Sequence, residues 1–152
     1  MYVDDIFGIC RRRDLAHDMG IAKEVCETIL GNDSMEPKKT ETGDRLTVIG
    51  YDIDIEKGFV AVARKNILKA LHGFLSTNVH SAITVKALQR LASWASRYSQ
   101  ICRYMAPFTR ALYSAYAGRT IKNGFPIPAA AGINILLFRV LLSLTAVKEQ
   151  DP

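Results

Sequence analysis

Residues 57–148 contain no aspartate or glutamate, although they contain 13 lysines and arginines. This absence excludes a surface on which charges of opposite sign neutralise each other, as they do on most solvated protein faces. A long stretch of one sign repels itself unless a polyanion lies beside it. We favour nucleic acid as that polyanion, because each phosphate that a cation neutralises releases condensed counterions. A ribosome or a membrane surface would also suit the charge pattern.

Cysteine is scarce as well. The chain has three cysteines, far apart in the sequence, at Cys10, Cys26 and Cys102. An odd number with wide spacing argues against a disulfide framework and favours a reduced, intracellular protein of the cytoplasm or nucleus. The three histidines show no zinc-ligand spacing with these cysteines, so the sequence does not predict a zinc site.

The sequence also lacks an apolar run of the roughly 20 residues that a membrane-spanning helix needs. The longest candidate, residues 133–147, is shorter and has Arg139 near its middle, where a charge is costly in a bilayer. We therefore expect a buried or docking helix and no membrane partner. The length of 152 residues and the hydrophobic content of 49% suit a globular domain with its own core and exclude a disordered tail.

The pattern that is present indicates an α+β fold. Apolar residues at three- and four-residue steps predict helices at 14–30, 64–75, 84–105, 107–117 and 129–147. The first of these should pack beneath a sheet through a stripe that includes Val25 and Ile29. Strand-forming residues predict a hairpin from 45–55 and 59–62, and a short hairpin near the start of the chain. Residues 32–44 and 124–128 are expected to be a loop and a linker.

The helix predicted at 84–105 has two distinct faces. One face carries the apolar residues Val85, Leu88, Ala92, Ala95, Cys102 and Met105, and the other carries Lys86, Arg90, Ser93, Arg97 and Gln100. Cations for phosphates and short polar groups for sugars suit the second face to a nucleic-acid backbone. The alternative is an ordinary solvated face, which would normally mix charges of both signs.

Two adjacent carboxylates, Asp4 and Asp5, follow an aromatic residue at the start of the chain, in the string Tyr2-Val3-Asp4-Asp5. Neighbouring carboxylates resist ionising together unless a cation compensates. Mg²⁺ is such a cation, and two Mg²⁺ ions about 3.5–4 Å apart can clamp the attacking and leaving oxygens of a phosphoryl transfer. The alternative is an acidic β-turn, in which aspartate is common.

Further segments accompany this string in a fixed order. They are Pro37-Lys38-Lys39-Thr40, the stretch Leu46–Asp54 with Ile49-Gly50-Tyr51 at its centre, and Thr84–Leu91 followed by Trp94-Ala95-Ser96. Tyr-x-Asp-Asp is the signature of reverse transcriptases, and from about residue 2 to residue 117 the chain resembles the retroviral and retrotransposon enzymes. The later segments are similar to the family's lysine motif, its primer grip and its thumb helix.

The resemblance implies roles for the first segments. Asp4 would bridge two Mg²⁺ ions, for which Mn²⁺ can substitute, with Asp5 as the more peripheral ligand. Tyr2 would stack near the primer–template duplex. Lys39, or less favourably Lys38, would approach the pyrophosphate leaving group of the dNTP, where a cation offsets developing charge. A solvated loop lysine is the alternative.

It also implies nucleic-acid contacts further along the chain. Ile49 and Gly50 would hold the primer strand, because the missing side chain of Gly50 lets a backbone approach; an ordinary hairpin with a bulge is the alternative. Gln89 and Trp94 resemble minor-groove residues of the thumb helix, but their spacing of five residues departs from the retroviral pattern and turns Trp94 to another face. Trp94 is otherwise a core anchor. Lys86, Arg90 and Arg97 would contact phosphates.

The resemblance implies three regions: a partial palm at 1–62, a helical thumb or connection at 63–123, and a linker with a last helix at 124–152. The family needs a third metal-binding aspartate and a fingers segment upstream of Tyr-x-Asp-Asp, and only Met1 precedes Tyr2 here. We therefore expect a fragment of a retroelement reverse transcriptase, an RNA-directed DNA polymerase, that does not polymerise alone unless a missing segment is supplied. The alternatives are a catalytically dead remnant that binds RNA–DNA hybrid or duplex DNA, and a helical module that docks an acidic protein.

Overall fold

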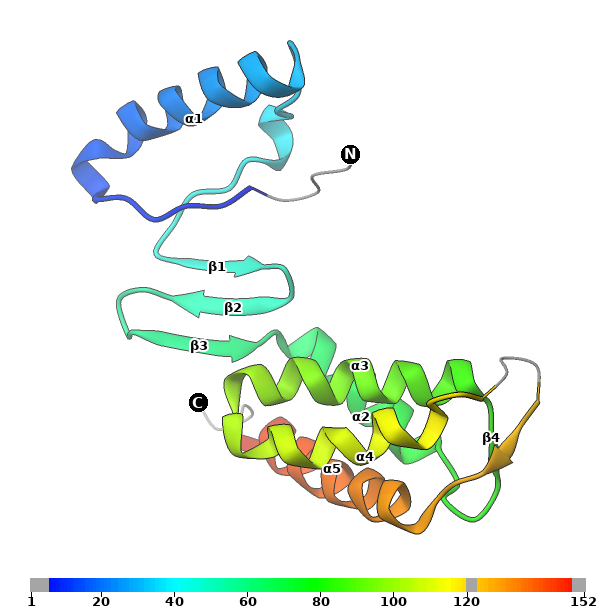
Figure 1. Ribbon diagram of the computed structural model, residues 1–152. Coiled ribbons are helices and arrows are strands. Elements are labelled where there is room, and N and C mark those ends of the chain that lie inside the picture. Colours follow the sequence, from blue (N-terminus) through cyan, green and yellow to red (C-terminus); the bar gives the residue numbers. More distant parts are fainter. Residues whose placement is uncertain (1–5, 120–122, 149–152) are drawn as a thin grey trace. The chain divides into compact units, whose positions relative to one another are not determined.

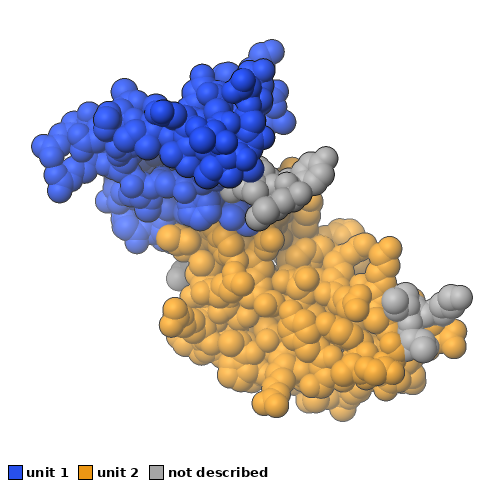
Figure 2. All heavy atoms as spheres, turned by 45° about the horizontal axis from the view of Figure 1, so that its top comes forward, with its two compact units in different colours: residues 1–49, 53–59 blue, residues 50–52, 60–152 orange. Residues whose placement is uncertain are grey.

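The computed structural model describes residues 6–119 and 123–148 (Figure 1). Within these residues the chain forms five α-helices, a three-stranded antiparallel sheet and a two-stranded antiparallel sheet. The predicted α+β class is therefore confirmed. The chain divides into two compact units (Figure 2): unit 1 contains residues 1–49 and 53–59, and unit 2 contains residues 50–52 and 60–152.

Helix α1 (Leu15–Leu30) is the main element of unit 1 and follows a 3₁₀ turn, η1 (Arg12–Asp14). The helix itself is confirmed, with Asp14 at its N-cap position and Gly31 after its last residue. The expected packing of its apolar stripe beneath a sheet is not confirmed. Cys26 is its one buried residue, and Ile29 is 73% exposed. The apolar stripe therefore contributes little burial to unit 1.

Three short strands form a meander in the order β1 (Arg45–Val48), β2 (Tyr51–Asp54) and β3 (Phe59–Val62). We expected residues 45–55 to be one strand, and this was wrong. Ile49 and Gly50 have φ angles of 50° and 82°, and two successive positive φ angles make the tight two-residue turn that matches strand twist. The turn divides the predicted strand in two.

Unit 2 contains the other helices: α2 (Arg64–Ser76), α3 (Val85–Ile101), α4 (Ala106–Tyr116) and α5 (Ala129–Lys148). All were predicted, although α3 ends earlier than expected and residues 103–105 form a 3₁₀ turn. Helix α3 packs on α4, and α5 packs on α2 and α4. The expected linker at 124–128 contains strand β5 (Phe125–Pro126), which pairs antiparallel with β4 (Ala82–Ile83).

The core of unit 2 lies among these helices. Phe74 of α2 stacks on Phe138 of α5 with ring centroids 5.5 Å apart, and Tyr98 of α3 meets Phe138 edge-on at 6.4 Å. Both phenylalanines and Leu88 are fully buried. Burying a side chain of this size stabilises a fold by about 1.5–3 kcal/mol, so α2, α3 and α5 are held to one another by these contacts.

Helix α5, Ala129–Lys148, agrees with the helix predicted at 129–147. Its apolar window Ala129–Val147 could cross a membrane by length and composition alone, and 28% of the window is buried within the protein. One such helix is weak evidence for a membrane span, so the expected absence of a membrane partner stays a prediction. Arg139 in this window donates from Nε to the carbonyl oxygen of Phe74 at 2.6 Å and from Nη2 to that of Thr77. The central charge of α5 thus satisfies carbonyls at the end of α2.

Candidate nucleic-acid interface

The predicted metal ligands Asp4 and Asp5, and Tyr2 beside them, lie outside the residues that the structure describes. Within residues 6–119 and 123–148, no three histidine, cysteine or acidic side chains lie close enough together to hold a metal ion. The magnesium site and its Mn²⁺ alternative therefore stay predictions.

Lys39 lies in the 3₁₀ turn η2 (Pro37–Lys39) of unit 1. Its Nζ is 2.7 Å from Oε2 of Glu36, and its side chain is 81% exposed. The hydrogen bond to Glu36, with the charge of that carboxylate, raises the pKa of Lys39. The geometry is that of a local ion pair on a solvated loop, so the role of Lys39 at a leaving group stays a prediction.

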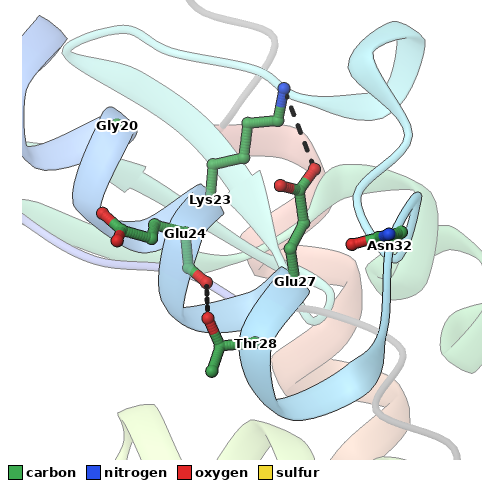
Figure 3. A pocket seen from close by; sticks show the side chains of 6 residues that line it. All are labelled: Gly20, Lys23, Glu24, Glu27, Thr28 and Asn32. Atoms are coloured by element: carbon green, nitrogen blue, oxygen red, sulfur yellow. Dashed lines mark hydrogen bonds and ion pairs between the residues drawn. The ribbon is translucent and has the colours of Figure 1, made fainter.

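A surface hollow of about 400 Å³ lies along α1 in the same unit (Figure 3). Two contacts join residues of its lining: Lys23 Nζ is 3.8 Å from Glu27 Oε1, and Thr28 donates to the carbonyl oxygen of Glu24 at 2.7 Å. Exposed pairs of this kind contribute little energy. The hollow has the polar composition of a solvated helix face.

Gly50, predicted to admit a primer backbone, is approached closely by groups of its own unit. A Cβ atom there would lie 2.2 Å from Arg97 Nη1 and 2.5 Å from Asn66 Nδ2. The carbonyl oxygen of Gly50 accepts hydrogen bonds from Ala63 N at 2.9 Å and from Asn66 Nδ2 at 3.2 Å. A residue with a side chain could not fit at position 50 without displacing its neighbours, because Arg97 and Asn66 occupy the space where its Cβ would lie. Ile49, in the turn before it, is 53% exposed.

Helix α3 presents the two faces that its sequence predicts. Thr84 caps it, with its Oγ1 accepting from Ala87 N at 3.2 Å. The apolar side is buried at Val85, Leu88, Leu91, Ala92 and Ala95. The opposite side carries Lys86 and Arg90, which are exposed, and Arg97, which is half-buried. We call these three residues the cationic face. Gln89 is exposed on the same helix.

Arg97 is held in place by neighbours in unit 2. Its guanidinium carbon lies 5.8 Å from the centre of the Tyr51 ring, a distance at which a cation is attracted to an aromatic face. The Tyr51 hydroxyl donates in turn to Oε1 of Gln100, one turn further along α3. Tyr51 is the aromatic residue of the predicted Ile-Gly-aromatic segment, so Gly50 and Tyr51 of this segment lie against Arg97 of the cationic face.

A pocket of about 390 Å³ opens between α2 and α3. The buried part of the pocket wall is apolar, and polar or charged side chains lie at its rim. We call this pocket the cationic pocket. The wall is made by Val62, Ile67, Ala70 and Leu142, and the remaining lining residues are Asn66, Lys69, Arg90, Ser93, Trp94, Arg97 and Tyr98. The structure thus brings together three of the predicted binding residues, Arg90, Trp94 and Arg97. Lys86 and Gln89 do not line the pocket.

Trp94 packs between two helices, as the core-anchor interpretation expects, and its minor-groove role stays a prediction. A Cβ atom on Gly73 would lie 2.1 Å from Trp94 Cζ3, so the ring packs directly against the backbone of α2. The ring is half-buried and lines the cationic pocket. It is therefore an anchor between two helices whose remaining surface faces the pocket.

Sequence reasoning missed Lys69 and Asn66, which α2 contributes to the pocket. The signal was present in the composition, because α2 contains cations and no acid. What the sequence could not supply was the pairing of α2 with α3, which brings Lys69 and Arg90 to one rim.

Comparisons with family models, with curated proteins and with solved structures gave no match. A functional assignment therefore depends on the residues themselves and on the geometry described above.

Proposed function

We propose that unit 2 binds nucleic acid, as an RNA–DNA hybrid or duplex DNA, along the cationic face of α3. The observation that carries this proposal is the meeting of Lys69, Arg90 and Arg97 at the rim of one pocket, on helices with no acidic residue between positions 57 and 148. Lysines and arginines on one face attract phosphates, and each phosphate that they neutralise releases condensed counterions. The spacing along α3 suits contacts to successive points of a backbone.

We also propose that the chain derives from a retroelement reverse transcriptase. The support is the string Tyr2-Val3-Asp4-Asp5 and the ordered segments that follow it. In that family Mg²⁺ stabilises charge on the transferred phosphoryl group. Asp4 and Asp5 have the hard oxygen donors that Mg²⁺ prefers, but two adjacent carboxylates do not complete a two-ion site. Catalysis would require a third carboxylate from another segment.

The experiment that tests nucleic-acid binding is a titration of the purified chain with labelled duplex DNA and RNA–DNA hybrid at several salt concentrations, read by fluorescence anisotropy. We expect log affinity to fall linearly with log salt, with a slope of about −0.9 for each phosphate contacted, hence about −3 for three contacts. Binding that barely responds to salt would contradict the proposal.

A second titration, with heparin and with a polyglutamate peptide, separates this function from an acidic-protein docking module. Nucleic acid has regularly spaced phosphates that a helix face can match. We expect the hybrid or duplex to bind more tightly than either competitor at equal charge. Equal affinity for polyglutamate would favour the docking module.

A further inference from the structure

The wall of the cationic pocket is unsuited to a duplex alone. Val62, Ile67 and Leu142 are at most 7% exposed where they form it. A duplex keeps its bases stacked inside and presents phosphates and sugars to a protein face, and these groups gain nothing from an apolar wall. The rim suits a phosphate backbone, and the wall suits a ligand with an apolar surface.

An unpaired nucleotide has both kinds of surface. Its base is a flat ring system that stacks on aromatic and apolar side chains, and its flanking phosphates carry the charge. Trp94 and Tyr98 supply aromatic surface beside the apolar wall, while Lys69 and Arg90 stand at the rim. Ser93 and Asn66 add a hydroxyl and an amide, the groups that read base edges or sugar oxygens.

The size of the pocket limits its occupant. At about 390 Å³ it is near the lower end of the roughly 300–1,000 Å³ typical of small-molecule sites. That volume admits one base with its sugar and does not admit a stacked pair. Arg97 closes one side, because its contacts with Tyr51 and with the space above Gly50 fix its position.

We propose that the cationic pocket receives one unpaired nucleotide of a bound strand, so that the protein prefers a duplex with a single-stranded overhang to a blunt one. The inference rests on the proposed nucleic-acid binding and adds the form of nucleic acid that is recognised. An overhang is favoured over a paired base because no pairing or stacking within the duplex has to be broken.

The test uses the chain's one tryptophan, whose fluorescence reports from the pocket itself. The full chain is titrated with three duplexes: one blunt, one with a short overhang, and one whose overhang has the same phosphates but abasic sugars. Anisotropy measures binding, and Trp94 emission measures occupancy of the pocket. We expect the overhang with bases to bind about tenfold more tightly than the abasic overhang and to quench Trp94 strongly.

Each result of the titration has a distinct meaning. Equal affinity for the normal and abasic overhangs, with unchanged Trp94 emission, would overturn the pocket assignment and leave nucleic-acid binding intact. Absence of binding to all three duplexes would overturn both proposals. A free nucleoside triphosphate that quenches Trp94 as tightly as the overhang would overturn recognition within a strand.

A pair of matched variants adds an independent arm. Ser93 is exposed and lines the pocket, whereas Ser114 is exposed on α4 and does not. Ser93→Phe should fill the pocket and reduce the preference for the overhang to about twofold or less, because the base could no longer stack there. Ser114→Phe should keep the full preference. Retention of the preference in Ser93→Phe would contradict the proposal.

Discussion

At Gly50, a single added carbon would disturb the candidate interface. The position combines a φ of +82° with neighbours that leave no room for a Cβ, since Arg97 Nη1 would be 2.2 Å away. The two requirements are separable, because Gly118 has a φ of +73° with nothing within 4 Å of its Cβ position.

We predict that Gly50→Ala lowers the free energy of unfolding more than Gly118→Ala does. Both variants meet the left-handed backbone cost of about 1–2 kcal/mol, and only Gly50→Ala must also displace Arg97 and Asn66. Chemical denaturation of both variants measures the difference. Equal losses would mean that the close approach of Arg97 is absent in solution.

Lys39 allows a pH prediction in unit 1. Its pKa is raised above the ordinary value of 10.5 by the hydrogen bond and charge of Glu36. A raised pKa means that the ion pair stabilises the fold below pH 10.5, and that this contribution is lost as the pH rises through the raised value.

We expect Glu36→Gln to return the pKa of Lys39 toward 10.5, as followed by NMR titration of the lysine side chain. The change should be seen in the folded protein and disappear in denaturant, where wild type and variant should titrate alike. A pKa that does not move on substitution would show that Lys39 has another partner.

Among the helices of unit 2, α2 and α5 pack closely on each other. Arg139 joins them by donating to the carbonyl oxygens of Phe74 and Thr77. These carbonyls lie at the end of α2, where no further helical turn supplies donors.

We predict that Arg139→Leu lowers the free energy of unfolding by about 1.5–3 kcal/mol, the range for hydrogen bonds that involve a charged group. The matched variant Arg110→Leu changes an exposed residue of α4 and should cost within about 0.5 kcal/mol. Thermal or chemical unfolding of the two variants gives the comparison. A neutral Arg139→Leu would argue that α5 does not pack on α2 as described.

Elements with local signals were predictable from the sequence, and elements with distant partners were not. Helix α3 has a threonine cap and an apolar stripe within its own residues, so its start and its two faces were predicted correctly. Ile83 pairs with Phe125 in strands of two residues each. Strands this short show no alternation of apolar and polar residues in the sequence. The turn at Ile49 was missed because a β-branched residue with positive φ is rare.

The same distinction applies to the candidate site. Arg90 and Arg97 were predicted from helical spacing, because both lie on one helix. The pocket beside them also needs Lys69 and Val62, and only tertiary packing brings these residues together. The Asp4-Asp5 string was recognised from its residues alone, and its geometry lies outside the described chain.

At the scale of the whole molecule, the division of charge in the sequence follows the division into units. The acidic residues of the first 56 positions belong to unit 1 apart from Asp52, and no acid lies between positions 57 and 148. The acid-free stretch 57–148 makes up most of unit 2 and gives it an excess of positive charge, and such an excess favours the approach of polyanions. The proposed binding function uses residues of unit 2, whereas the proposed ancestral synthesis would need Asp4 and Asp5 as well.

We predict that the chain alone does not extend a primer with either Mg²⁺ or Mn²⁺. Two adjacent carboxylates do not fix two divalent ions in the geometry of phosphoryl transfer. A primer-extension assay on purified protein checks this. Incorporation that Asp4→Asn abolishes would contradict the prediction and establish a working polymerase site.

Two double variants of equal charge test whether the cationic face of α3 contacts phosphates, as we propose. Lys86→Gln/Arg90→Gln removes two cations from the face, and Arg103→Gln/Arg110→Gln removes two exposed cations elsewhere in unit 2. The slope of log affinity against log salt on an RNA–DNA hybrid should become shallower by about 1.8 in the first variant, at about 0.9 for each lost contact, and stay unchanged in the second. Equal changes in both slopes would show that only net charge matters, and would contradict the account.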